Sequence, residues 1–266
     1  MATHDAAESA ACVVAWNILH GGGGQRMPQI TLGLLEHEPD IVVLTEFRTT
    51  TGGQIAGILS DIGLKHQLTS LPAAGSNGIC IASRWPLEQR AETCGLDPQK
   101  WLACRVVGPE WLLGGVHLPD ATQPTARTSY WRDLVQIAAA WSKVKPTSKA
   151  LLIGDFNSGR HRLDESGRTF ATTSRLGELA TLGYCDIYRA LHPDGRAVSW
   201  VSRVGKGFRL DSAWASPSLH ADVRSVEYSQ IERENRVSDH AILKIRVKID
   251  GFSCGREAAD ASRRNP

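Results

Sequence analysis

The segment LLIGDFNSG, residues 151–159, decides how the rest of the sequence is interpreted. Its branched aliphatic residues predict a buried strand, and Asp155 and Asn157 follow directly. Side chains two residues apart in a strand point to the same side, so we expect Asp155 and Asn157 to lie side by side, with Phe156 turned into the core. A polar residue at a single strand end is ordinarily a turn former or a cap. If other predicted strands also end in polar residues, Asp155 and Asn157 are more readily explained as part of a functional site.

Polar residues stand at the tips of five further apolar runs. In four of them the polar residue is at the C-terminal end: Asn17 in CVVAWN (12–17), Glu46 in DIVVLTE (40–46), His117 in EWLLGGVH (110–117) and Asp211 after GFRL (207–210). In the fifth, Ser238, Asp239 and His240 precede AILKIRV (241–247). A mixed sheet whose last strand runs opposite to the others would bring all these tips to one edge.

The residue types at these tips are those of a hydrolytic metal site. Glu46, His117 and His240 are poor turn formers, so turns alone do not account for them. Carboxylates and amides suit an oxygen-preferring cation, and imidazoles suit proton transfer. The scarcity of cysteines and the absence of an HxxxH motif argue against zinc.

The hydrophobic pattern predicts an α/β (α+β) fold with two packed mixed sheets and helices outside. Hairpins late in the chain favour mixed rather than purely parallel sheets. Strands are expected at 12–17, 40–46, 77–87, 100–107, 110–117 and 149–156, and in the runs AVSWVSR, FRLDSAWAS, DVRSVEYSQI and AILKIRVKI; helices are expected at 28–38, 53–61, 125–143 and 173–183. No linker divides the chain, so we expect one domain over residues 1–250 and a flexible polar tail over 251–266.

Composition excludes several classes of protein. A chain of 266 residues with 42% hydrophobic residues can bury a substantial core. The net charge of +2 excludes binding to nucleic acid by overall electrostatics alone. Six cysteines without a CxxC pair argue against a zinc ribbon or a redox motif. We find no signal peptide and no membrane span, and expect a cytoplasmic protein.

Five motifs in order carry a family resemblance: DIVVLTE, GVHLPD, LLIGDFN, the RLD of GFRLD, and SDHA. Over about residues 12 to 247 the chain resembles the endonuclease/exonuclease/phosphatase superfamily, which includes deoxyribonuclease I, exonuclease III, apurinic endonucleases, inositol polyphosphate 5-phosphatases and bacterial sphingomyelinases. The resemblance implies a four-layer α/β sandwich around two mixed sheets. It also implies a Mg²⁺-dependent active site at one edge, with Mn²⁺ as an alternative ion.

The resemblance also implies roles for the metal-site residues. Glu46 is the main Mg²⁺ ligand, and Asn17 lies beside the metal and the phosphate. Asp239 is a candidate second ligand. Several apurinic endonucleases carry an Asp two residues after the first-strand Asn, but Leu19 stands there in this chain. This departure favours a single metal held mainly by Glu46.

Proton transfer is assigned to a second group of residues by the same resemblance. Asp211 hydrogen-bonds to His240 and fixes its tautomer, and His240 contacts the phosphate or acts as general base. Asp155 orients water or protonates the leaving oxygen, and Asn157 donates to a phosphate oxygen. His117 neutralises charge or serves as leaving-group acid. The assignment of acid and base stays open.

Three further residues are candidates for substrate binding. Arg127 follows His117 at the start of a helix that faces substrate in family members, whereas Arg48, Arg84 and Arg209 are weaker phosphate-binding candidates. Trp200 and Phe208 occupy positions that line a sugar pocket in exonuclease III-like enzymes, with core packing as the alternative. HGGGG (20–24) lacks the Walker spacing and is expected to be a loop.

These observations predict a Mg²⁺-dependent DNA endonuclease or exonuclease that acts as a monomer. The alternative enzyme is a phosphatase or phosphodiesterase for a small or lipid phosphate ester. A non-catalytic nucleic-acid-binding domain is a third class, but such a domain would not need Glu46, Asp155 and His240 together.

Overall fold

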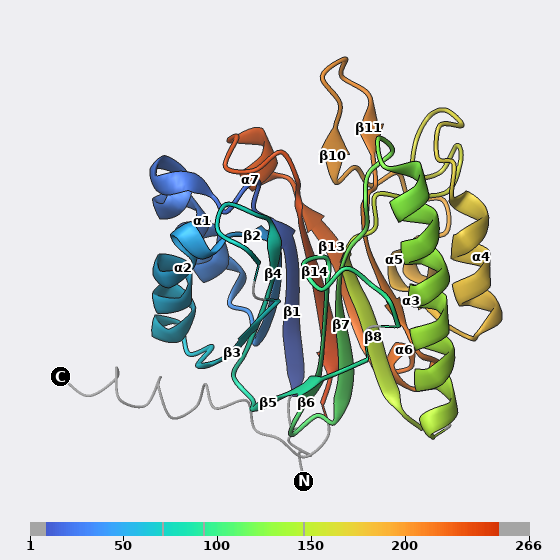
Figure 1. The fold of residues 1–266 in the computed structure, drawn as a ribbon, viewed down its shortest axis with the longest axis horizontal. Coiled ribbons are helices and arrows are strands. Elements are labelled where there is room, and N and C mark those ends of the chain that lie inside the picture. Colours follow the sequence, from blue (N-terminus) through green and yellow to red (C-terminus); the bar gives the residue numbers. More distant parts are fainter. Residues whose placement is uncertain (1–8, 71, 93, 146, 250–266) are drawn as a thin grey trace, which may run out of the picture.

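The computed structural model describes residues 9–70, 72–92, 94–145 and 147–249. Two six-stranded sheets pack face to face in the centre of the molecule (Figure 1). The first has the order β13 (Val223–Ser229), β14 (Ile242–Lys248), β1 (Ala10–Asn17), β2 (Ile41–Phe47), β4 (Gly78–Ser83), β3 (His66–Thr69). The second has the order β5 (Leu87–Arg90), β6 (Trp101–Val106), β7 (Trp111–His117), β8 (Lys149–Asp155), β12 (Asp211–Ala215), β9 (Cys185–Asp186).

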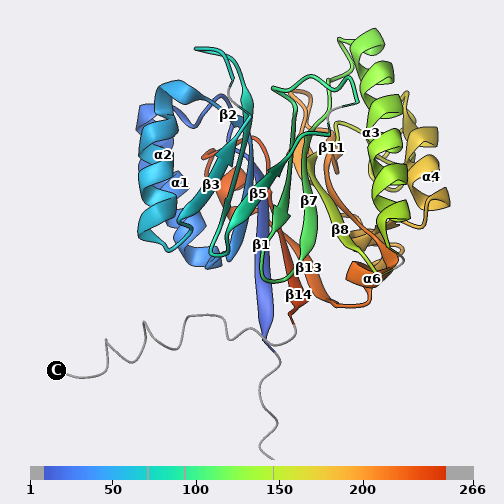
Figure 2. The ribbon, with the colours of Figure 1, turned by 60° about the horizontal axis from the view of Figure 1, so that its bottom comes forward.

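Helices cover the outer face of each sheet. α1 (Gly23–His37) and α2 (Thr49–Asp61) lie on the first sheet, and α3 (Pro124–Val144) and α4 (Thr173–Thr181) lie on the second (Figure 2). Three short helices complete the described part of the chain: α5 (Ile187–Leu191), α6 (Pro217–His220) and α7 (Ile231–Glu234). The predicted four-layer sandwich is therefore confirmed.

The central strands are largely apolar because both faces of each sheet are buried there, whereas the edge strands β3, β5 and β13 keep exposed residues. In β1, alternate residues enter different cores. Ala11, Val13 and Ala15 pack between the two sheets. Cys12, Val14 and Trp16 pack against α1 and α2. The third core lies between the second sheet and α3 and α4, and it contains Phe156, as expected from the DFN motif.

Strand direction explains how the polar tips meet. β1 runs parallel to β2 and antiparallel to β14, so the residues before β14 lie at the same edge as Asn17. The prediction of an oppositely directed last strand is confirmed. Asp211 corrects the expected pattern, because it begins β12 and does not end a strand, and β12 runs antiparallel to β8. Two N-terminal tips therefore reach the edge, where only one was predicted.

Several element bounds differ from the expectation. α1 begins at Gly23, inside the predicted HGGGG loop, and Pro28 lies within the helix. β3 and β5 were not predicted; both are short, and their side chains are mostly partly exposed or exposed, so their hydrophobic pattern is weak. The predicted tail over 251–266 lies outside the described residues.

The expected strand FRLDSAWAS is divided into two elements. Its first part belongs to a separate hairpin of β10 (Trp200–Val201) and β11 (Gly207–Phe208), which rises from the edge of the sandwich (Figure 1). At the base of the hairpin Ser199 donates to the backbone oxygen of Phe208 and accepts from the backbone nitrogen of Ala241, which directly precedes β14 of the first sheet. The hairpin therefore stands beside the edge where the polar tips converge.

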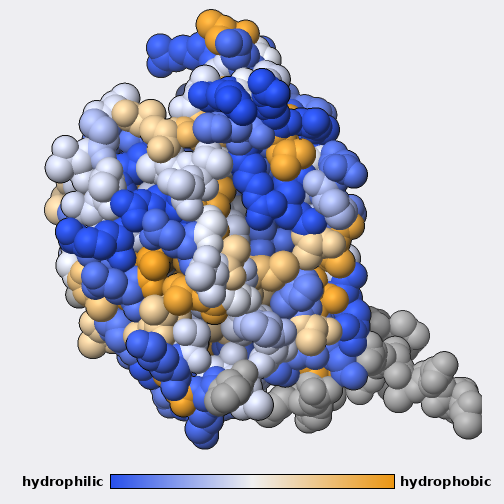
Figure 3. Space-filling model, turned by 90° about the vertical axis from the view of Figure 1, so that its right-hand side faces the viewer, coloured by the Kyte–Doolittle hydropathy of each residue, from blue (hydrophilic) through white to orange (hydrophobic). Residues whose placement is uncertain are grey.

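The surface carries no extended hydrophobic area on the side seen in Figure 3, where hydrophilic and hydrophobic residues are interspersed. The large exposed hydrophobic side chains of the described residues are scattered: Leu32, Leu35, Val144, Leu191, Val204 and Ile231. Within the described ranges, no helix combines the length and the apolar character needed to cross a membrane.

Candidate active site

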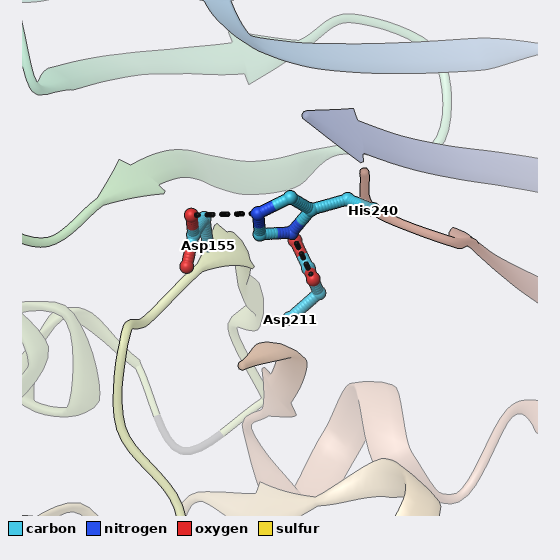
Figure 4. A group of neighbouring side chains, drawn as sticks. All are labelled: Asp155, Asp211 and His240. Atoms are coloured by element: carbon cyan, nitrogen blue, oxygen red, sulfur yellow. Dashed lines mark hydrogen bonds and ion pairs between the residues drawn. The ribbon is translucent and has the colours of Figure 1, made fainter. Parts of the chain in front are cut away.

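His240 lies between the carboxylates of Asp155 and Asp211 (Figure 4). Its Nδ1 is 2.7 Å from Asp211 Oδ2, which is a hydrogen bond, and its Nε2 is 3.9 Å from Asp155 Oδ2. The second distance is too long for a direct hydrogen bond, but a single oxygen atom can bond to both groups. All three side chains are buried. The expected pairing of Asp211 with His240 is therefore present.

The sheet ladders fix the relative positions of these groups. Asp211 is directly opposite Asp155 in the β8–β12 ladder, and His117 is opposite Asp155 in the β7–β8 ladder. His240 is joined by an isolated bridge to Trp200, at the base of the β10–β11 hairpin. His117, Asp155 and Asp211, at the strand ends of the second sheet, are thus brought together by backbone pairing alone.

Asn17 connects this group to Glu46. Its side-chain amide nitrogen lies 3.2 Å from Glu46 Oε1 and 3.2 Å from Asp155 Oδ2, and donates to both. Glu46 has a left-handed backbone with φ 56°, at a bulge in the β2–β4 ladder between Thr45 and Phe47. Bulges redirect side chains next to active sites, and here the bulge accompanies a carboxylate at the open end of the strand.

Two further residues, for which no role was predicted, connect the loops of the site. Ser238 donates its hydroxyl to the backbone oxygen of Asn17 at 2.5 Å and accepts from the backbone nitrogen of His240 at 3.2 Å. Arg26 donates to the backbone oxygens of Leu19 and Val237. Ser238 belongs to the SDHA motif, so its position offered a signal. Arg26 lies in an unremarkable stretch and offered none.

Burial and neighbouring charge shift the pKa values of the site. Burial alone lowers the pKa of His240, but the Asp211 carboxylate outweighs burial and raises that pKa above its usual value. Burial raises the pKa of Asp155, and the negative charge of Asp211 adds to the effect. Burial, reinforced by Lys100, lowers the pKa of His117 to about 3, so this imidazole is neutral at pH 7.

His117 presents an unpaired polar atom in the site. The side chain is 7% exposed, and its Nδ1 is buried without a hydrogen-bond partner among the described residues. An unpaired buried nitrogen costs free energy, on the order of 1–3 kcal/mol. A ligand or a water molecule bound at this edge would satisfy the nitrogen.

Asn157 and Arg127 are arranged differently from the expectation. β8 ends at Asp155, and Asn157 has a left-handed backbone with φ 45°, so the strand alternation that predicted its direction does not extend to it. Its amide nitrogen donates to the backbone oxygen of Leu118 at 2.8 Å. Arg127 is 4% exposed and donates to the backbone oxygen of Asn157 at 2.5 Å. Arg127 therefore orders the turn that follows Asp155.

Trp200 and Phe208 face each other across the β10–β11 hairpin. Their ring centroids are 5.7 Å apart, and both side chains are partly exposed. The indole nitrogen of Trp200 donates to Asp239 Oδ2 at 3.0 Å. Asp239 is exposed and engaged with this indole, so the hairpin and the SDHA motif form one wall of the site.

Two of the weaker arginine candidates are structural in this fold. Arg84 pairs with Asp40, which precedes β2, at the end of the strand opposite to Glu46. Arg209 is buried, and its guanidinium bonds to Asp164 and Asp186. Neither side chain reaches the edge that carries His240, so neither is a phosphate ligand. A sequence motif alone does not reveal that Arg209 points into the interior.

The donor set at this edge suits a hard cation. Within the described ranges, Asp155, Asp211 and His240 form a group whose ligand atoms lie within 4.8 Å of one another, and it can hold a metal ion. Glu46 and Asn17 offer a second set of oxygen atoms, linked to the first through Asp155. Both sets are hydrogen-bonded in this structure: His240 Nδ1 to Asp211, Glu46 Oε2 to the backbone nitrogen of His20, and Asn17 Oδ1 to that of Leu19. Oxygen-rich sets of this kind suit Mg²⁺ rather than zinc.

A family model for the Endonuclease/Exonuclease/phosphatase family matches residues 14–240. The chain belongs to this family. The match spans all the polar tips from Asn17 to His240, and its members are phosphate-ester hydrolases. No curated protein sequence matches the chain at a significant level.

Solved structures share the fold of this Endonuclease/Exonuclease/phosphatase family member. A 3' phosphatase, NExo, from Neisseria bound to a product DNA hairpin has a TM-score of 0.75 at 22% identity, covering 90% of this chain and 99% of that one. An AP endonuclease from Archaeoglobus fulgidus has a TM-score of 0.74 at 19% identity, with 90% and 99% covered. The 3'-5' exonuclease NExo from Neisseria meningitidis has a TM-score of 0.74 at 22% identity, with 89% and 99% covered.

Proposed function

We propose that this protein is a Mg²⁺-dependent nuclease that hydrolyses phosphodiester bonds of DNA. The observation that carries the proposal is the position of His240, hydrogen-bonded to Asp211 and 3.9 Å from Asp155, at the edge that also carries Glu46. In-line attack on a phosphate needs a nucleophile, neutralised charge and help for the leaving group. This edge offers groups for each of the three tasks.

Glu46 and Asn17 are proposed to hold the metal ion, whereas the Asp239 carboxylate is held by the Trp200 indole at 3.0 Å. Mg²⁺, or Mn²⁺ in its place, would supply positive charge to a phosphate oxygen and to the attacking water. Asn17 has a second task that does not depend on the ion. Its amide nitrogen holds the Glu46 and Asp155 carboxylates in position at 3.2 Å each.

His240 and Asp155 are proposed to share the proton transfer. Asp211 accepts the Nδ1 proton of His240, which leaves Nε2 to face Asp155 and the open edge. An oxygen atom bound between Nε2 and Asp155 is positioned by both groups, as general acid–base catalysis requires.

The substrate contacts are proposed for residues around this centre. Neutral His117, beside Asp155, and Asn157, which has a second amide hydrogen free of Leu118, are suited to hydrogen bonds with phosphate oxygens. Arg127 acts by holding the turn of Asn157. The partly exposed rings of Trp200 and Phe208 are suited to stack on a sugar or a base.

DNA is proposed as the substrate because two of the similar solved structures are described by activity on it or by a bound DNA product. A DNA 3'-phosphate and a small or lipid phosphate ester are the alternative substrates, since one fold supports many activities. We further propose that the protein acts as a monomer and in the cytoplasm.

A cleavage assay tests the proposal directly. The substrates are plain duplex DNA, duplex with an abasic site, single strands, a 3'-phosphorylated hairpin, RNA and phosphoinositides, each with Mg²⁺ and with EDTA. We expect metal-dependent cleavage of at least one DNA substrate by the wild type. Turnover of phosphoinositides without cleavage of any DNA would refute the DNA assignment, and the absence of all hydrolysis would favour a binding domain.

A further inference from the structure

A hollow of about 250 Å³ opens directly beside the proposed active site. It lies between the loop after β1, the β10–β11 hairpin and the segment that joins α7 to β14. Its lining consists of Leu19, Val201, Arg233, Arg236, Ser238 and Asp239. Ser238 and Asp239 immediately precede His240, and consecutive Cα atoms lie about 3.8 Å apart. The hollow therefore adjoins the chain segment that carries His240.

Two guanidinium groups dominate the charge of this hollow, which we call the Arg233–Arg236 pocket. Arg233 donates through Nε to Gln230 at 3.0 Å, and its nearest carboxylate, Glu234, is 3.9 Å away. Arg236 is exposed and has no ion pair among the described residues. Its left-handed backbone, with φ 58°, sets it at the turn that leads to Ser238. At least one guanidinium therefore has all its donors available for a ligand.

The negative charge on the pocket wall is already engaged. Asp239 accepts a hydrogen bond from the Trp200 indole at 3.0 Å, and its charge also interacts with Arg26. Leu19 on the opposite wall adds an apolar surface and no ligand atom. A second metal ion would meet two guanidinium groups and one occupied carboxylate here. The lining is unsuited to a cation and suited to an anion.

We infer that the Arg233–Arg236 pocket binds the phosphate of a nucleic-acid strand next to the one that is cleaved. Arginine presents planar donors that match phosphate oxygens, and the volume is sufficient for a phosphate group. The net charge of only +2 means that strand binding depends on such local sites. This inference rests on the proposed function, because it assumes a strand whose neighbouring phosphate lies at His240.

Equilibrium binding in EDTA measures the pocket without any turnover. A fluorescein-labelled DNA oligonucleotide is titrated by anisotropy at several salt concentrations with the wild type, Arg236→Gln, Arg233→Gln and Lys143→Gln. Lys143 is exposed at the far end of α3, so its variant removes the same charge away from the pocket. We expect Arg236→Gln to weaken binding several-fold and to reduce the salt slope by about 1, as the loss of one phosphate contact does. Arg236→Lys should restore part of the affinity.

Cleavage of modified strands identifies the phosphate that occupies the pocket. In two modified strands, a neutral methylphosphonate replaces the phosphate on the 5' side or on the 3' side of the scissile bond. A third strand ends at the neighbouring position with a terminal phosphate. On one of the two sides, the neutral group should reduce the rate at which the wild type cleaves the strand. The same modification should not reduce the rate of Arg236→Gln any further. A terminal phosphate that restores binding would show that a strand end also fits.

Two outcomes overturn the inference in different ways. If Arg236→Gln and Arg233→Gln both bind like Lys143→Gln while the wild type cleaves DNA, the pocket does not hold a phosphate and the proposed function stands. If the wild type neither binds nor cleaves any nucleic acid, the proposed function fails and the inference fails with it. Thermal melting of each variant excludes misfolding as the cause of a weakened affinity.

Discussion

Asp155 and Asp211 lie directly opposite one another in the β8–β12 ladder, one as the last residue of its strand and the other as the first. The two carboxylates belong to motifs far apart in the chain, yet backbone hydrogen bonds between the strands fix their separation. His240 reaches the pair from the other sheet. The site is therefore held by both halves of the sandwich, and its parts can be tested separately.

Replacing His240 tests the catalytic centre. We expect His240→Ala to lower kcat by about 10²–10⁴-fold, the range for loss of a general acid or base, because no other described residue donates to Asp211 Oδ2 while facing Asp155. The measurement is DNA cleavage at saturating Mg²⁺, with thermal melting to check folding. His66→Ala, at an exposed position of β3, is the matched control and should behave as the wild type. A His240→Ala protein with undiminished kcat would contradict the mechanism.

Replacing Glu46 separates the two sets of metal ligands. We expect Glu46→Gln to raise the Mg²⁺ concentration for half-maximal activity at least several-fold, because a neutral amide is a weaker ligand for a hard cation. Asp211→Asn should instead lower kcat and leave that concentration nearly unchanged. Direct Mn²⁺ binding by electron paramagnetic resonance gives a readout without turnover. The reverse pattern would assign the ion to the group of Asp155, Asp211 and His240.

A buried ion-pair network behind the site is expected to contribute to the free energy of unfolding. The Asp164 carboxylate accepts from Arg209 at 2.6 Å and also from Arg189, and all three side chains are buried. Removal of one partner of a buried pair costs roughly 3–5 kcal/mol. We expect Asp164→Asn to reduce the free energy of unfolding by about that amount in urea titrations. Glu178→Gln, at a half-exposed pair on α4, is the control and should change it by less than about 1 kcal/mol.

The Asp164 carboxylate should also make the free energy of unfolding depend on pH. Burial alone would raise the pKa of Asp164, but the positive charge of Arg209 outweighs it and the pKa lies below the ordinary value of 3.8. Its stabilising contribution is therefore complete above the pKa of the unfolded chain and is lost as pH falls through the folded pKa. We expect the stability of the wild type to decline below about pH 4 more steeply than that of Asp164→Asn. Equal slopes for the two proteins would contradict this assignment.

Gly154 is required for the approach of β7 to β8. Its backbone has φ 140°, and a Cβ atom there would overlap the carbonyl oxygen of Val116. We expect Gly154→Ala to destabilise the fold by more than about 2 kcal/mol and to reduce activity, because Asp155 is the next residue. Gly53 in α2 has open space around it, so Gly53→Ala should stabilise the protein by about 0.5–1 kcal/mol. Thermal and urea unfolding measure both changes.

Much of the fold follows from the sequence because the strands are buried on both faces. The apolar runs at β1, β2, β7 and β8 end where their polar residue begins, so both the strands and their tips can be located. β3 and β5 lack this pattern because they lie at sheet edges and none of their residues is fully buried. The helix α1 begins inside a glycine run, where local propensity argues for a loop but packing of Met27 and Ile30 stabilises the helix.

The sequence by itself determined which residue types stand at the strand ends, and these types indicated a hard-metal phosphate chemistry. The tertiary structure alone decided that Asp211 begins a strand opposite Asp155, that Arg209 points inward, and that Arg233 and Arg236 line a hollow beside His240. The physical reason is that side-chain chemistry is a property of single residues. Strand pairing and side-chain direction depend on contacts between segments that are distant in the chain.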